Sequence, residues 1–168
     1  MMPVTVRAEA PGDVNAIDGV IVAAFRSAAH RSGTEQHIVR ALRAANALTV
    51  SLVATDGVAV GHVAVSEVRV DGRACNWFGL GPVSVMPSHQ GCGIGSQLIE
   101  AALVSLRERS AAGCVVLGNP NYYGRFGFRP DADLVLPDVP PAYFQALSFR
   151  APQPRGVVEY HPAFNANA

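Results

Sequence analysis

The residues best suited to chemistry lie in a glycine-rich stretch, Gln90-Gly-Cys-Gly-Ile-Gly-Ser96. The run before it, 82–86, is apolar and rich in β-branched residues, and an apolar-periodic segment begins near Ile94. A strand, a glycine turn and a helix in this order expose backbone N–H groups at the positive end of a helix dipole. The stretch therefore predicts a site for an anion, most often a phosphate.

Two common phosphate-binding motifs do not fit this turn. A P-loop requires a lysine, and all 13 basic residues of the chain are arginine. A dinucleotide-binding fingerprint requires a third glycine where Ser96 stands, and it requires an acidic residue after the next strand, which 114–119 does not supply. A purely structural glycine turn remains as the alternative to a binding site.

The turn does match the pattern Gln90-x-x-Gly-x-Gly95, and a second pattern, Tyr123-x-x-x-Gly-Phe128, follows it in the chain. In this order the two patterns resemble the Q/R-x-x-G-x-G/A signature and the Y-x-x-x-G-F segment of the GNAT superfamily of N-acetyltransferases. Within that superfamily, residues 82–128 are most similar to the YhbS-like predicted acetyltransferases. The resemblance implies an α/β (α+β) fold, with helices flanking a mixed, mostly antiparallel sheet that is splayed between its fourth and fifth strands. It also implies acetyl-CoA as cosubstrate and no metal.

The same resemblance implies which residues hold the cosubstrate. Backbone amides of the turn would hold the pyrophosphate, because glycines let the backbone approach phosphate oxygens. The strand before the turn would lie beside the pantetheine arm, and a bulge near Gly81-Pro82 would separate it from the fifth strand. The predicted cosubstrate-binding residues are Val83, Ser84, Val85, Gln90, Gly91, Cys92, Gly93, Ile94, Gly95, Ser96, Asn119 and Tyr123.

Tyr123 occupies the position of the family's proton donor to the departing thiolate, so we predict a catalytic role for it. The alternative is a core aromatic residue whose hydroxyl is satisfied. A backbone N–H at Val83 or a neighbour is expected to stabilise the oxyanion. Tyr122 is expected to pack in the core, and Arg125 either reaches a phosphate of the cosubstrate or is solvated.

The sequence does not fix the general base. Glu67 is the first candidate, because it interrupts the alternating strand beside the fourth one, although an ion pair with Arg69 or Arg73 explains it equally well. His62, on the opposite pleat, is the second candidate.

Four further residues are weighed against simpler roles. His30 and Glu35 lie in the region that usually covers the acceptor in this family, but Glu35 also suits a helix cap. His89 is expected at the surface. Cys92 is interpreted as incidental, because family members generally transfer the acyl group directly, although a thiol at a helix N-terminus can be reactive.

Local patterns predict the elements that position these residues. Asp13 and the box Ser32-Gly-Thr-Glu35 predict helix starts, and the dipeptides at 56–57 and 71–72 predict tight hairpin turns. The expected helices cover residues 13–27, 32–46 and 94–112. The expected strands cover residues 3–8, 49–55, 58–70, 74–86, 114–117, 142–150 and 156–164. The strand at 114–117 should lie parallel to the fourth, and the last two strands are expected to pair with each other.

Composition limits the remaining classes. The 168 residues suit a single domain, 1–168, with a cosubstrate-binding core at 79–128 and a C-terminal strand pair at 142–164. Zero net charge argues against a nucleic-acid partner. The three widely spaced cysteines indicate neither disulfides nor zinc. No signal pattern or apolar run of about 18 residues predicts a membrane contact, so a cytoplasmic location is expected.

The sequence therefore predicts an N-acetyltransferase that moves an acetyl group from acetyl-CoA to a primary amine by direct attack in a ternary complex. The acceptor would be a small-molecule or peptide amine, and the proline-rich tail is compatible with a homodimer. The alternative is a non-catalytic acyl-CoA-binding or sensing module with the same fold.

Overall fold

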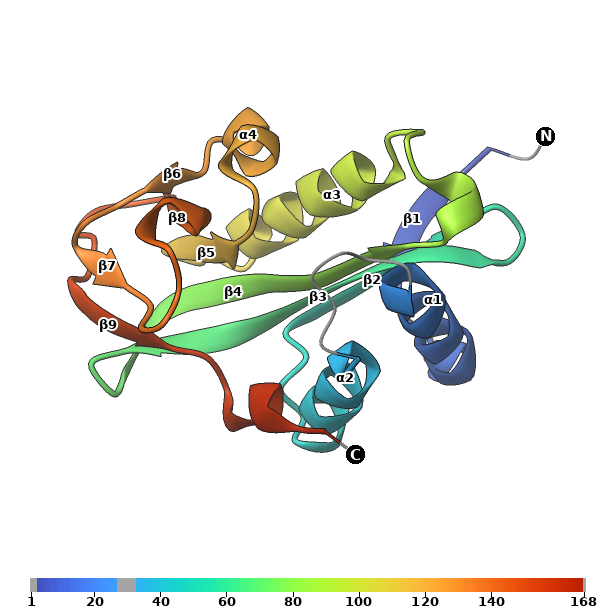
Figure 1. Ribbon diagram of the computed structural model, residues 1–168, viewed down its shortest axis with the longest axis horizontal. Coiled ribbons are helices and arrows are strands. Elements are labelled where there is room, and N and C mark those ends of the chain that lie inside the picture. The colour runs from blue at the N-terminus through green and yellow to red at the C-terminus, as the bar shows by residue number, and fades with distance from the viewer. Residues whose placement is uncertain (1–2, 27–32, 168) are drawn as a thin grey trace.

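The computed structural model describes residues 3–26 and 33–167, which form a mixed sheet with helices on both faces (Figure 1). The strands follow the order β1-β2-β3-β4-β5-β8-β6, and β9 pairs with both β3 and β7. The helices are α1 (Val14–Arg26), α2 (Glu35–Ala44), α3 (Ile94–Glu108) and α4 (Pro120–Tyr123). The strands are β1 (Thr5–Ala8), β2 (Val50–Thr55), β3 (Ala59–Val70), β4 (Arg73–Val85), β5 (Gly113–Leu117), β6 (Arg129–Pro130), β7 (Leu134–Val135), β8 (Phe144–Ser148) and β9 (Gly156–Glu159).

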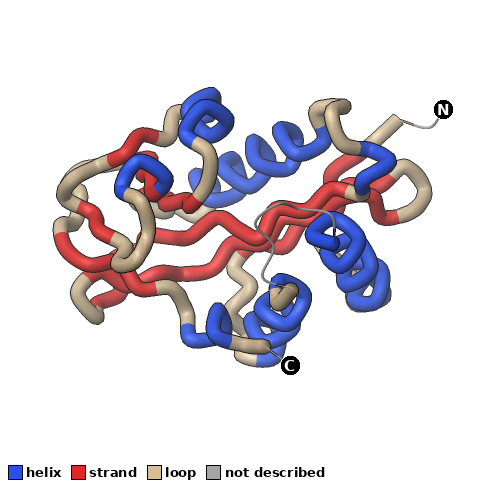
Figure 2. The backbone as a smooth tube through the Cα atoms, viewed as in Figure 1, coloured by secondary structure: helices blue, strands red, loops and turns tan. Residues whose placement is uncertain are grey.

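The long helices form where apolar spacing predicts them, because each buries one stripe against the sheet. α1 buries Ile17 and Ile21, and α3 buries Leu98 and Leu106. Figure 2 shows α3 on one side of the strands and α1 and α2 on the other. α3 ends at Glu108, four residues before the expected end, because the chain then turns through left-handed backbone.

Neither predicted N-cap has the expected geometry. Asp13 closes a short 3-10 turn, where its carboxylate accepts a hydrogen bond from the Ala10 N–H at 2.7 Å. α2 begins at Glu35 itself, and the Glu35 carboxylate accepts from the Thr34 N–H at 3.1 Å. Ser32 lies outside the described residues.

The central strands β2, β3 and β4 form the predicted antiparallel meander. At its second turn, Asp71 and Gly72 both have positive φ, 50° and 78°. This is the type I′ geometry, which matches the twist of the strands it joins.

β4 parts from β5 where the sequence predicts a bulge. The parallel ladder between the two strands ends at the Leu80–Val116 pair. The next residues, Gly81 and Pro82, form an irregularity in the pairing of β4 with β3. Pro82 has no N–H to donate to a ladder, so the break falls at a residue that cannot continue it. We call the place beyond the Leu80–Val116 pair the fork.

The prediction that the last two strands pair with each other is wrong. β8 pairs with β5 and β6, whereas β9 pairs with β3 and β7 (Figure 1). Each covers an edge that would otherwise be open: β8 the outer edge of β5, and β9 the end of β3 that extends past β2. Local patterns predicted that strands form here, but not which edges they would find.

Across residues 3–26 and 33–167, no helix is both long and apolar enough to cross a membrane. In the same ranges, no group of three or more His, Cys, Asp or Glu side chains is arranged to hold a metal ion.

Candidate active site

The glycine turn leaves a row of backbone N–H groups without partners. Gly91 and Gly93 have φ of 77° and 83°, and Gly93 directly precedes α3. A Cβ at either glycine would meet nothing within 4 Å, so the space beside the turn is open. Within the part of the chain that the structure describes, no backbone N–H from residue 91 to 96 donates a hydrogen bond. Because the positive end of the α3 dipole lies at the same place, the turn can hold an anion.

β4 presents a free edge beside the turn. The Met86 N–H donates to the Val60 carbonyl at 2.8 Å. Because alternate residues of an antiparallel strand bond to the neighbouring strand, this bond determines which residues of β4 bond to β3. Ser84 then bonds toward β3, whereas Val83 and Val85 direct their N–H and C=O groups away from it. Since β5 has already diverged, the Val83 N–H and C=O and the Val85 N–H are available to an extended ligand as a strand edge, whereas the Val85 C=O accepts a hydrogen bond from the Gln90 side-chain amide at 3.1 Å.

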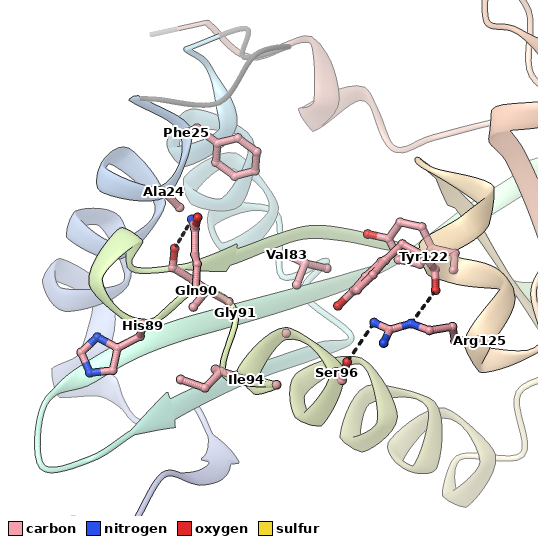
Figure 3. A pocket seen from close by; sticks show the side chains of 14 residues that line it. Ala24, Phe25, Val83, His89, Gln90, Gly91, Ile94, Ser96, Tyr122 and Arg125 are labelled. Atoms are coloured by element: carbon pink, nitrogen blue, oxygen red, sulfur yellow. Dashed lines mark hydrogen bonds between the residues drawn. The ribbon is translucent and has the colours of Figure 1, made fainter. Parts of the chain in front are cut away.

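A cavity of about 530 Å³ joins the turn, the free edge of β4 and α4 (Figure 3). Figure 3 shows His89 and Gln90 at one end, Val83 along the middle, and Tyr122 and Arg125 at the other end. The lining residues are Ala24, Phe25, Val83, Val85, His89, Gln90, Gly91, Gly93, Ile94, Gly95, Ser96, Tyr122, Tyr123 and Arg125. We call it the first cavity. It brings together most of the predicted cosubstrate-binding residues.

Three predicted residues do not line the first cavity. The Ser84 side chain is 1% exposed and packs on the other face of β4. Cys92 is exposed, and its thiol lies 3.7 Å from the Gln90 carbonyl. Asn119 caps α4, where its Oδ1 accepts from the Asn121 N–H at 2.9 Å.

Arg125 makes the α4 end of the first cavity positive. Its guanidinium donates to the Ser96 hydroxyl at 3.3 Å and lies 4.5 Å from the centre of the Tyr122 ring. The guanidinium also donates to the Tyr122 carbonyl at 3.3 Å, and the dashed lines of Figure 3 mark this bond and the bond to Ser96. Together these contacts hold the cation beside the first turn of α3. A guanidinium in this position adds to the field of the helix N-terminus, and both attract an anion.

Tyr123 lies at the same end, with its ring against Gly118. A Cβ at Gly118 would lie 2.5 Å from a ring carbon, so only glycine leaves room for this ring. Tyr122 and Phe128 meet the ring edge-on, with centroids 5.0 and 6.0 Å away. Burial is the main cause that raises the Tyr123 pKa to about 12. The phenol is therefore protonated at neutral pH and is a hydrogen-bond donor.

Glu67 does not line the first cavity, and its role as general base stays a prediction. Its exposed side chain lines a second cavity of about 620 Å³, together with Arg69, Glu159 and Tyr160. The alternative, an ion pair of Glu67 with Arg69 or Arg73, is absent among the described residues.

His62 is fully buried in a polar network that we call the Glu9–His62 network. Its Nε2 lies 2.8 Å from the Ser51 hydroxyl, which donates to Glu9 at 2.6 Å, and Arg43 binds the same carboxylate at 2.8 Å. Because Ser51 gives its one proton to a carboxylate, His62 must donate from Nε2. Burial is the largest of the effects that lower the His62 pKa to about 4. The imidazole is neutral and lies away from the first cavity.

The other two histidines under consideration lie elsewhere. His89 lines the first cavity at the end away from Tyr122 and pairs with Asp56 at 3.1 Å. His30 lies outside the described residues. No carboxylate lines the first cavity in the described ranges, and His89 is its one imidazole there.

Sequence reasoning missed Ala24 and Phe25, which line the first cavity from the end of α1. Their spacing matches the apolar stripe of α1, and spacing alone cannot separate a core residue from one that lines a cavity. Tyr122 was expected only to pack, yet its ring lines the same cavity beneath Arg125.

Comparison with known proteins gives a consistent set of similarities. The acetyltransferase (GNAT) domain family matches residues 47–130. YhbS of Escherichia coli (strain K12), described as an uncharacterized N-acetyltransferase, is 38% identical over 95% of this chain and 98% of its own length. A crystal structure of YhbS from E. coli in complex with CoA has a TM-score of 0.90 at 35% identity, covering 100% of this chain and 95% of that one. A GNAT family acetyltransferase from Brucella melitensis, crystallised with acetyl-CoA, has a TM-score of 0.87 at 47% identity, covering 98% of this chain and 99% of that one.

Proposed function

Because this chain belongs to the GNAT family of N-acetyltransferases, we propose that it transfers the acetyl group of acetyl-CoA to a primary amine by direct attack. One observation carries the proposal furthest: the unpaired N–H groups of residues 91–96 lie at the N-terminus of α3, beside open space. Relatives crystallised with acetyl-CoA or CoA share the fold along nearly the whole chain, which supports the same ligand here.

Successive parts of the first cavity match successive parts of acetyl-CoA: its phosphates, its pantetheine arm and its thioester. The turn and Arg125 would hold its phosphates, because both supply positive potential beside α3. The N–H and C=O of Val83 and the N–H of Val85 would pair with the amides of the pantetheine arm. The thioester would then lie near the fork, where Tyr123 lines the cavity.

The chain's own groups supply two parts of the chemistry. The nitrogen of the acceptor attacks the thioester carbon, the C–N bond forms and the C–S bond breaks. The Val83 N–H, which points away from β3, would donate a hydrogen bond to the carbonyl oxygen on which negative charge develops, as in an oxyanion hole. The Tyr123 phenol gives its proton to the leaving thiolate and regains one from solvent, and the proton lost by the nitrogen also passes to solvent.

A small-molecule or peptide amine is the proposed acceptor. Its nitrogen must be unprotonated when it attacks, and among the described residues no carboxylate lines the first cavity to take that proton. The same observation favours a second candidate, a non-catalytic acyl-CoA-binding or sensing module with this fold.

A panel of amines separates the two candidates. We expect acetyl-CoA to bind, and at least one amine class to release CoA, detected by a thiol reagent, at a rate that depends on both substrates. Binding without release across small amines, polyamines and peptide N-termini would support the sensing module. Absence of binding would reject both.

A further inference from the structure

A second tyrosine, Tyr160, lies at the fork. It follows β9, and its ring packs on Gly79 of β4, where a Cβ would lie 2.4 Å from ring carbon Cε1. Gly79 directly precedes Leu80, the last β4 residue that pairs with β5. The ring of Tyr160 therefore covers the last part of the ladder before the two strands part.

The two tyrosines reach the fork from opposite faces of the sheet. Tyr123 packs with the core beneath α3, whereas Tyr160 packs with Trp77 and Val115 on the opposite face. Each lies against a glycine of the diverging strands, Gly118 in the first case and Gly79 in the second. A larger residue at either position would push a phenol away from the fork.

The Tyr160 side chain is partly buried and lines the second cavity. Burial first, and then the charges of Cys114 and Tyr123, raise the Tyr160 pKa, so the phenol stays protonated. In the described residues, its oxygen makes no hydrogen bond to the protein, and it is not one of the fully buried unpaired side-chain atoms. Because Tyr160 lines the second cavity, a ligand that reaches the fork from that side would give this oxygen a partner.

We propose that Tyr160 is the hydrogen-bonding residue on the acceptor side, whose phenol oxygen accepts a hydrogen bond from the attacking amine. This inference rests on the proposed function. The cosubstrate reaches the fork along the free edge of β4 from the glycine turn, on the side that Tyr123 and α3 share. The acceptor then approaches on the face that Tyr160 covers. The phenol keeps its own proton throughout the transfer and fixes the direction of the nitrogen lone pair.

The test compares Tyr160→Phe with wild type, using hydroxylamine as the acceptor because it is small and nucleophilic at neutral pH. The substitution keeps the ring on Gly79 and removes only the oxygen. We expect the KM for hydroxylamine to rise about five- to tenfold, while the Kd for acetyl-CoA by titration calorimetry changes by less than about twofold. Tyr143→Phe, at a half-exposed ring outside both cavities, is the matched control and should change neither value.

Two further measurements guard against a merely structural effect. Gly79→Ala should raise the same KM, because its Cβ would displace the ring. In a crystal structure with acetyl-CoA, the Tyr160 hydroxyl should lie within about 4 Å of the acetyl group. A distance above about 6 Å, or an unchanged KM in Tyr160→Phe, would overturn the inference and leave the proposed function intact. If wild type neither binds acetyl-CoA nor acetylates any amine, the proposed function fails and the inference fails with it.

Discussion

Two side chains at the α4 end of the first cavity, Tyr123 and Arg125, are suited to different functions. The phenol is buried and protonated, which suits a proton donor. The guanidinium is exposed but held by Ser96 and Tyr122, which suits a partner for a phosphate. Each role predicts a different kinetic defect.

Replacing Tyr123 by Phe should lower kcat by roughly 100-fold or more, because the leaving thiolate loses its proton donor. The Kd for acetyl-CoA should change little, since the ring still fills the space beside Gly118. Steady-state kinetics and calorimetry measure the two quantities, with Tyr143→Phe, outside both cavities, as the control. An unchanged kcat would assign Tyr123 to packing alone.

Replacing Arg125 by Gln should raise the Kd for acetyl-CoA by about fivefold, because one cation near the phosphates is lost. The difference from wild type should shrink when the salt concentration rises, as expected for a partly exposed charge. Arg155→Gln, at an exposed pair with Asp133 at 3.1 Å, is the control. If the Arg125 variant and wild type bind acetyl-CoA with the same Kd at low salt, Arg125 does not contribute to binding.

At the scale of the elements, the start of α3 depends on left-handed backbone at Gly93, φ 83°. Gly93→Ala should lower the free energy of unfolding by about 1–2 kcal/mol, because an alanine is strained there. It should also weaken acetyl-CoA binding, since the N–H groups of the turn change direction.

Gly19→Ala is the matched control for this prediction. Gly19 lies inside α1 with nothing within 4 Å of an added Cβ and without positive φ, so the substitution should stabilise the protein by about 0.5–1 kcal/mol. Urea unfolding and calorimetry report both variants. A lower free energy of unfolding in Gly93→Ala and a higher one in Gly19→Ala would support strain in the turn. A change in the same direction in both variants would contradict it.

The same scale shows how far the sequence predicts this fold. The turn at Gln90–Ser96, the bulge at Pro82 and the type I′ turn at Asp71 are local, so residue identity and spacing predict them. The partners of β8 and β9 are not local, because any open edge accepts a strand. The contact of Tyr160 with Gly79 joins residues about half the chain apart, so neither residue alone predicts it.

At the scale of the whole molecule, the Glu9–His62 network ties the two ends of the α1–α2 layer to the sheet. Arg43 comes from α2, Glu9 precedes α1, and Ser51 and His62 come from β2 and β3. Because the imidazole is buried and neutral, its protonation opposes the folded state.

The pH dependence of stability follows from this burial. The folded pKa of His62 is about 4 and the ordinary value is 6.5, so between these pH values the unfolded chain binds more protons. The full contribution is present above about pH 6.5, and it is lost as the pH falls toward 4. At pH 5 the loss should be about 2 kcal/mol.

His62→Gln tests this, since it keeps a neutral donor to Ser51. The unfolding free energy of wild type relative to this variant should fall between pH 7.5 and pH 5, by urea titration. A relative stability that is the same at both pH values would contradict a buried neutral imidazole.

The most direct test of the central claim is a single-turnover experiment with acetyl-CoA labelled in its acetyl group and an amine that supports CoA release. The label should pass to the amine in one phase, and no label should remain on the denatured protein when the amine is left out. Cys92→Ala should behave like wild type, because the exposed thiol has no part in a direct transfer. Label that accumulates on the protein before the amine is added, and then leaves with it, would contradict direct attack at the fork.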